Sequence, residues 1–212
     1  MPDISLEERL RSATQHVRTF ACSQSRTLSP KGPATERWYV LADGRYRKER
    51  EDGIVICDGS NMWLVPKGRG DVYKQPQSLP PLDRMLDPAW LFDEHDVVAT
   101  GTTVHNGRPA ITAEAKLRPD AAADYPEAAG VTQHELIIDD EYGFLLWRLD
   151  LAVGLEFSFA DVQVNEPIDE SLFRYEIEPG RKVREKIPAA AVLGIAAVAV
   201  IAKGPGWFGR KR

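Results

Sequence analysis

The chain has few of the side chains that most often build metal centres and nucleophilic sites, with only 2 cysteines and 4 histidines among 212 residues. Cys22 and Cys57 lack the close spacing of a metal site. Whether they form a disulfide depends on whether the fold brings their strands together. The run 93–96 (Asp-Glu-His-Asp) is acidic, but consecutive residues of an extended chain point to opposite faces. We therefore interpret it as a solvated loop and predict no metal site.

Motifs for catalysis are also missing. No Gly-rich phosphate-binding loop occurs, and Ser60 lies in a sequence typical of a hairpin turn, outside any nucleophile elbow. His105 and His134 have no evident nucleophile partner nearby in the sequence. We therefore expect a protein that is not an enzyme and that binds no cofactor.

An excess of positive charge is absent too. Lysine and arginine number 27 against 32 acidic residues, which gives a net charge of −5. Nucleic-acid-binding proteins normally present a basic face, so we expect no nucleic-acid partner. The first eight residues are acidic and lack an apolar stretch, so we expect no secretory signal at this end.

Long apolar runs are limited to residues 187–202, 16 residues without a charge. As a helix this run would be roughly 24 Å long, whereas the hydrocarbon core of a bilayer is roughly 30 Å thick. Snorkelling of Lys203 and an interfacial belt of Trp207 and Phe208 would lengthen it enough to span. We interpret residues 181–212 as a basic linker and an apolar C-terminal helix that anchors the protein to a membrane, on an undetermined side. A buried C-terminal helix and a membrane-surface helix are the alternatives; the lack of a polar stripe argues against the second.

What the chain does have is a succession of short strand patterns bounded by Gly, Pro or Asp. This spacing predicts an antiparallel meander. An amphipathic helix precedes it, capped by Ser5 with Glu8 at the capping-box position. The expected strands of the first half are 19–28, 36–41, 45–50, 54–57, 62–65 and 72–74.

The middle of the chain predicts a helical insert and a hairpin. Residues 82–92 carry apolar side chains at mixed helical spacing, interrupted by Pro88, and indicate two short helices or helical turns. Strands are expected at 96–104 and 108–117, joined at Asn106-Gly107, the strongest hairpin signal in the chain. The Ala-rich acidic stretch 119–130 is expected to be a surface loop or a partial lid.

The stretch 136–180 predicts two or three long antiparallel strands. A turn at 139–143 precedes a strand on which Arg148 and Asp150 point away from the apolar face. That apolar face is formed by Leu145, Trp147, Leu149 and Leu151. In the next strand the alternation slips by one residue at Ala160-Asp161, which predicts a β-bulge and a bent sheet.

The order of these pieces resembles the LolA-like lipoprotein-carrier superfamily, including RseB-like and actinobacterial outer-membrane-lipoprotein-carrier-like proteins. The resemblance covers about residues 5–180, which we take as one domain, and the tail 181–212 lies beyond it. It implies an α+β, mainly β fold: a curved half-open antiparallel β-barrel, with the N-terminal helix and a short helical insert as a lid over an apolar cavity for acyl chains. The matching pieces are Trp38 with Arg45 to Arg47, Asp58-Gly59 with Trp63 and Pro66, Leu86-Asp87-Pro88 with Trp90-Leu91, Asn106-Gly107-Arg108, and Ile168-Asp169 to Phe173.

A concave sheet face rich in aromatic residues and covered by helices would hold an apolar ligand. The alternative is that the same side chains simply fill the core. We predict a non-enzymatic domain that binds a lipid or the acyl chain of a lipoprotein, or else a regulatory scaffold of the same fold that binds a protein. Arg45, Arg47, Lys48 and Arg50 would meet that protein or an anionic headgroup, unless they form only a solvated strand face. The expected ligand-contacting residues are Trp38, Trp63, Trp90, Leu91, Trp147, Phe157 and Phe159.

Overall fold

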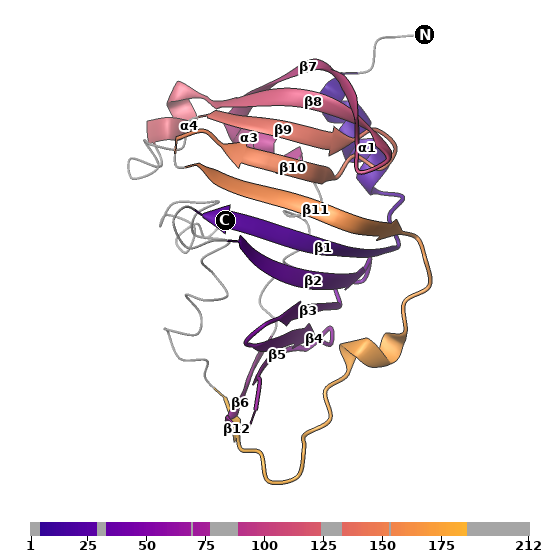
Figure 1. The fold of residues 1–212 in the computed structure, drawn as a ribbon, viewed down its shortest axis with the longest axis vertical. Coiled ribbons are helices and arrows are strands. Elements are labelled where there is room, and N and C mark those ends of the chain that lie inside the picture. Colours follow the sequence, from indigo (N-terminus) through magenta and orange to yellow (C-terminus); the bar gives the residue numbers. More distant parts are fainter. Residues whose placement is uncertain are drawn as a thin grey trace.

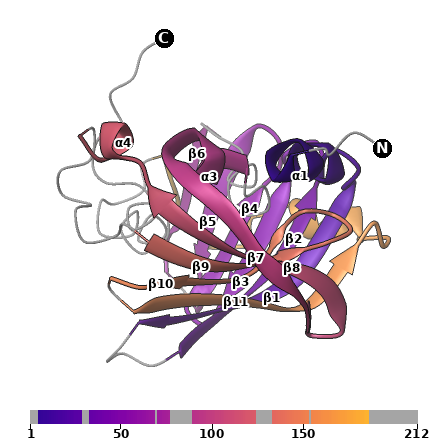
Figure 2. The same ribbon diagram turned by 90° about the horizontal axis from the view of Figure 1, so that it is seen from above.

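The computed structural model describes residues 5–28, 33–68, 70–76, 89–123, 133–152 and 154–185. In this part of the chain, 12 strands form one sheet in the order β12-β6-β5-β4-β3-β2-β1-β11-β10-β9-β8-β7 (Figure 1). The sheet does not close, because β7 and β12 lie at opposite edges. Seen from above, it is twisted and curved (Figure 2). The predicted fold class is thereby confirmed as mainly β, with a curved open sheet and few helices.

Strand pairing follows the chain closely. The first meander runs from β1 to β6 and the second from β7 to β11, and both are joined where β1 pairs with β11. All pairs are antiparallel except β12 with β6. The strands are β1 (Thr19–Leu28), β2 (Pro33–Leu41), β3 (Tyr46–Arg50), β4 (Gly53–Cys57), β5 (Asn61–Pro66), β6 (Val72–Pro76), β7 (His95–His105), β8 (Arg108–Leu117), β9 (Gln133–Asp139), β10 (Leu145–Asp150), β11 (Leu155–Val164) and β12 (Val183–Arg184).

The turns and the bulge that shape the sheet were predictable and are confirmed. Asn106 and Gly107 both have positive φ, 50° and 79°, as a two-residue hairpin turn requires. Asp161 has φ 49°, and the β1–β11 register shifts between Ala21 and Ser23. The extra residue in β11 is therefore a β-bulge at the predicted place, and bulges increase local twist.

The described helices are short. α1 (Leu6–Thr14) begins with the predicted capping box, in which Ser5 and Glu8 exchange side-chain and backbone bonds. α3 (Ala89–Glu94) forms the end of the expected helical insert, whose earlier residues 82–88 lie outside the described part. α4 (Pro119–Ala123) is a single turn where a loop was expected.

The predicted tail helix 187–202 lies outside the described residues, which end at 185. None of the helices in the described ranges has both the length and the apolar character needed to cross a membrane. Residues 183–184, which the sequence placed in the linker, form β12 beside β6.

Hydrophobic side chains gather on both faces of the sheet. The main cluster lies on the face that carries α1 and α3, because Leu10 of α1 and Leu91 of α3 belong to it; this is called the inner face below. A second cluster lies on the outer face of β4 to β6, where Tyr175 and Val183 of the C-terminal segment pack on it. That segment, residues 165–185, descends from β11 past the 3-10 helix η2 (Glu170–Phe173) to β12 (Figure 1).

Candidate binding face

The inner face brings together four of the predicted ligand-contacting residues. Trp38 on β2, Phe157 and Phe159 on β11 and Leu91 on α3 are all buried in the main cluster. They share the face because directly paired residues of adjacent strands project to the same side. Four of the seven predicted residues thus lie in one cluster, and their contact with a ligand stays a prediction.

Trp38 lies in a polar setting within this apolar face. Its indole Nε1 donates a hydrogen bond of 3.0 Å to Oε1 of the buried Gln24. The ammonium of Lys48 lies 4.7 Å from the centre of a Trp38 ring, a cation–π distance. Lys48 in turn is 2.6 Å from Glu36, and both are buried. Burial lowers the pKa of Lys48, while Glu36 acts to raise it.

The predicted cationic surface of β3 does not exist as one surface. Lys48 faces inward, whereas Arg45 and Arg47 contact the C-terminal segment on the outer face, at Glu170 (3.0 Å) and the carbonyl of Leu172 (3.3 Å). Adjacent residues of a strand point to opposite faces, so Arg47 and Lys48 could not share a surface. The prediction was therefore wrong for Lys48.

Trp63 was predicted to share a face with Trp38 and does not. It lies directly opposite Ile56 in the β4–β5 pair, and both belong to the outer-face cluster. Its ring is 5.3 Å from that of Tyr175, and its Nε1 donates to Asp58 at 2.8 Å. Because both faces of β4 and β5 are apolar, alternation alone did not tell which face is inner.

Trp147 also lies on the outer face. In β10 the buried alternating residues are Arg148 and Asp150, whereas Trp147 and Leu149 are only half-buried. Trp147 donates to Glu156 at 2.7 Å. The sequence prediction that the polar residues of this strand point outward was therefore wrong. A register shift between Leu145 and Trp147 lets Leu145 and Leu146 both enter the core.

A second polar group lies on the inner face, over β7 to β11. The imidazole rings of His95 and His134 have centroids 5.2 Å apart, and both are buried. His134 pairs with Asp150 across β9 and β10. Arg148 places its guanidinium carbon 4.5 Å from the centre of the Phe157 ring. Histidine, arginine and carboxylate groups are thus packed among aromatic and aliphatic side chains.

Burial dominates the electrostatics of this group. It lowers the pKa of His134 to about 3, with further lowering by the charge of Arg148. His134 is therefore neutral at pH 7. Burial lowers the pKa of Arg148 to about 10, opposed by the charge of Asp150. The guanidinium group thus stays positively charged at neutral pH in a largely apolar setting.

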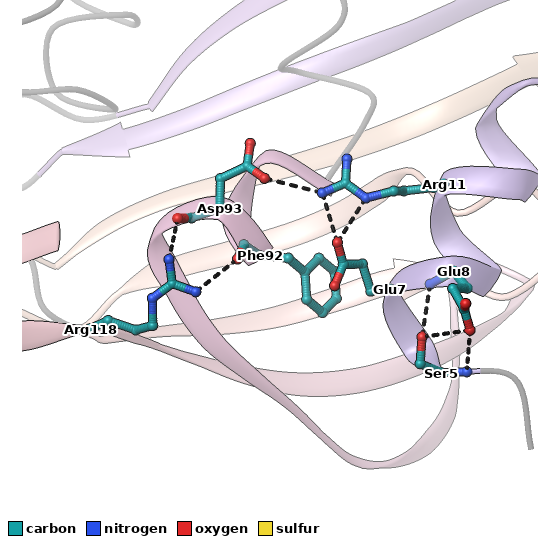
Figure 3. Close-up of polar contacts among 7 residues, drawn as sticks. All are labelled: Ser5, Glu7, Glu8, Arg11, Phe92, Asp93 and Arg118. Carbon is teal, nitrogen blue, oxygen red and sulfur yellow. Dashed lines mark hydrogen bonds and ion pairs between the residues drawn. The ribbon is translucent and has the colours of Figure 1, made fainter. Parts of the chain in front are cut away.

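Polar contacts near the surface fix α3 beside α1. Arg11 of α1 contacts both Glu7 (2.8 Å) and Asp93 of α3 (3.1 Å). Arg118, after β8, donates to the backbone carbonyls of Phe92 (3.2 Å) and Asp93 (Figure 3). The acidic run around His95 is therefore part helix end and part strand, and its Asp93 binds arginine. Trp90 is the second residue of α3, next to Leu91, but its side chain lies outside what the structure describes.

Cys22 and Cys57 are buried and unpaired in the structure, which resolves the alternative that the sequence left open. Burial raises the pKa of both thiols to about 12, so neither is a reactive thiolate at neutral pH. Across the described ranges, no three His, Cys, Asp or Glu side chains gather in a way that could hold a metal ion.

Sequence reasoning missed the polar residues of the inner face. Arg148 and Asp150 were visible as alternating charges in an apolar strand, but their position was assigned to solvent. Gln24 and Glu36 lie in strands of high polar content, which likewise suggested exposure. No local signal marked them as buried, because charged residues that alternate with apolar ones are typical of the solvent-exposed face of a strand.

The fold is similar to known structures at low sequence identity. An uncharacterized conserved protein of Thermus thermophilus matches with a TM-score of 0.55 and 11% identity, over 85% of this chain and 97% of that one. MucB matches with a TM-score of 0.50 and 19% identity, over 81% of this chain and 62% of its own length. The lipoprotein LppX of Mycobacterium tuberculosis gives 0.49 and 15%, over 79% and 98%. No protein-family model and no curated protein sequence matches the chain.

MucB has the LolA-like fold, and the resemblance drawn from the order of the sequence pieces is confirmed as a likeness of fold. The chain spans about three fifths of MucB, 62% of its length.

Proposed function

We propose that this LolA-like chain is a non-enzymatic binding domain. It holds the apolar chain of a lipid, or of an acylated protein, between the inner face of its sheet and the helices over that face. The LolA-like fold supports this function, since neighbours of that fold include lipoproteins and lipoprotein-sorting proteins by name. The place of the ligand on the inner face is argued from the side chains of this chain.

The observation that carries the proposal is the placement of the main hydrophobic cluster on the helix-covered side of a single open sheet. Trp38, Phe157 and Phe159 line that side, and the described helices over it are only 9 and 6 residues long. A ligand chain that replaces helix contacts keeps apolar surface buried, at about 25 cal/mol per Å².

The polar contact between α1 and α3 is weak enough to allow a ligand chain to replace contacts of these helices. Arg11 and Asp93 join α1 to α3 with side chains that are 42% and 68% exposed. Exposed ion pairs typically contribute less than about 1 kcal/mol. This ion pair therefore adds little to the cost of moving α1 away from α3, and a ligand chain that replaces the contacts of the buried Leu10 and Leu91 would offset the larger, apolar part of that cost.

Membrane association through residues 187–202 is part of the proposal. The apolar run would tether the domain at the surface from which its ligand is taken or to which it is delivered. Membrane fractionation with and without residues 187–212 tests this part, and equal distribution of both chains would contradict it.

Lipid extraction and native mass spectrometry of the purified protein test the binding function. We expect a bound lipid or, after delipidation, uptake of a fluorescent fatty-acid analogue. A protein that purifies without lipid and leaves the fluorescence of the analogue unchanged would contradict the proposal.

A second candidate is a protein-binding domain of the same fold without lipid cargo. It is favoured by β7, an edge strand whose Val98 and Val104 are 62% and 70% exposed. An exposed edge can pair with an extended segment of a partner. Val98→Lys with Val104→Lys would then abolish capture of that partner, whereas lipid uptake on the inner face would be unaffected.

A further inference from the structure

Two arginines flank one aromatic ring on the inner face of the sheet. Arg26 of β1 lies directly across from Phe157 of β11, and Arg148 of β10 lies directly across from Phe157 on the other side. Two strand spacings separate the arginine backbones, about 10 Å. Side chains of this length can reach a common point above the ring between them.

Both guanidinium groups have buried nitrogens without a hydrogen-bond acceptor. In the described part of the chain, Nη1 of Arg26 and Nε of Arg148 are fully enclosed and make no hydrogen bond. Arg148 as a whole is only 7% exposed. Buried polar groups almost always have a partner, so two such donors on the strands that flank Phe157 indicate an acceptor that the described residues do not supply.

The local charge points to the same kind of acceptor. Neither Arg26 nor Arg148 has a carboxylate of the described residues within ion-pair distance, and Asp150 acts on the pKa of Arg148 through its charge. Arg26 also helps to lower the pKa of Lys48, but Lys48 already forms an ion pair with Glu36. Although the chain carries a net charge of −5, this part of the inner face has more cations than anions. Guanidinium groups bind carboxylate and phosphate oxygens with charge-assisted hydrogen bonds.

We propose that Arg26 and Arg148, on either side of Phe157, bind the acidic group of an amphiphilic ligand, a carboxylate or a phosphate carried on an apolar chain. This inference rests on the proposed function, since the apolar chain lies on the same face. It adds the ligand class: the inner face selects anionic amphiphiles over neutral ones. His134, neutral and close to Arg148, offers a further hydrogen-bonding nitrogen whose Nδ1 has no partner among the described residues.

Binding of cis-parinaric acid and of its methyl ester, followed by the fluorescence of the chain, tests the proposal on the delipidated full-length protein. The two probes have the same apolar chain and differ only in the charge of the head. We expect the acid to bind about tenfold more tightly or better, since hydrogen bonds to charged groups exceed neutral ones by about that factor. Acetate alone should not displace the acid, because the chain supplies the rest of the affinity.

Three variants assign the effect to these residues. Arg148→Met and Arg26→Met should each remove most of the preference for the acid and leave binding of the ester within about threefold of wild type. Arg47→Met, on the outer face of β3, removes the same charge and should change neither affinity. Because Arg148 is buried among apolar side chains, Arg26→Met at a half-buried site provides a separate test should Arg148→Met fold poorly.

Each other result counts against a specific claim. Equal affinity for acid and ester would overturn the selection of anions and leave the proposed function standing. A preference for the acid that survives both arginine variants would overturn the assignment to this site. If acetate at the concentration of the probe displaced cis-parinaric acid, the claim that the bound anion is carried on an apolar chain would be overturned. Failure of both probes to bind would overturn this inference together with the proposed function.

Discussion

The ammonium nitrogen of Lys48 lies 2.6 Å from a carboxylate oxygen of Glu36, and both side chains are buried on the inner face. Removing one partner of a buried ion pair leaves the other charge uncompensated, which typically costs about 3–5 kcal/mol. We therefore expect Lys48→Met to lower the free energy of unfolding by about that amount, measured by urea denaturation.

Two variants separate this effect from a general loss of charge. Glu36→Leu combined with Lys48→Met removes both charges and should restore most of the lost stability, because neither partner of this pair is left as an uncompensated buried charge. Lys67→Met, at an exposed position after β5, should change stability by less than about 0.5 kcal/mol. Equal stability of the single Lys48 variant and wild type would contradict the buried-pair interpretation.

Acid should destabilise the fold through His134. Its pKa is lowered to about 3 by burial and by the charges of Arg148 and His95, whereas an unfolded histidine titrates near about 6.5. The unfolded chain therefore binds a proton that the folded chain does not, and stability is lost as the pH falls from about 6.5 towards about 3. Between pH 7 and 5 this should cost about 2 kcal/mol, measured by denaturation at a series of pH values.

The control for this titration is a second histidine. His134→Gln should flatten the loss between pH 7 and 5, and His95, whose pKa burial also lowers, accounts for part of the remainder. His16→Gln, at an exposed site after α1, is the matched substitution of a histidine outside the core. A His134→Gln profile as steep as that of wild type would show that this imidazole is already protonated in the folded state.

Gly53 makes the close approach of β4 to β5 possible. A Cβ at this position would lie 2.4 Å from the carbonyl oxygen of Val65, and φ is 156°. Gly53→Ala must therefore displace backbone and should destabilise the fold by about 1–3 kcal/mol. Gly70→Ala is the matched control, since its Cβ would meet Pro66 at an ordinary 3.6 Å. Thermal unfolding of both variants checks the difference, and equal melting temperatures would contradict it.

The two faces of the sheet predict different roles for two tryptophans. Trp38 lies on the inner face and Trp63 on the outer face against Tyr175. Trp63→Phe should therefore lower stability but leave the affinity for a fluorescent fatty acid within about threefold of wild type. Trp38→Phe removes the bond to Gln24 and should weaken binding by about tenfold, the effect of losing about 1.4 kcal/mol of contact. Equal binding by both variants would place the ligand elsewhere.

Local signals in the sequence were sufficient to predict the strands, the first helix and the turns between them. The capping box at Ser5, the Asn106-Gly107 hairpin and the bulge at Asp161 all depend on neighbouring residues, through hydrogen bonds or a positive φ. Such features form in the same way wherever the strand lies in the sheet. For that reason the order of the elements along the chain and the LolA-like fold could be predicted from the sequence alone.

The tertiary structure alone decided which face of each strand became the inside. Alternation separates the two sets of side chains in a strand, but in β4, β5 and β10 both sets include large apolar residues, and both faces are at least partly covered. The C-terminal segment made Trp63 a residue of the outer face by packing Tyr175 on it, and long-range pairing turned Arg148 inward onto Phe157. These positions depend on contacts between residues far apart in the chain, whose energies no local pattern contains.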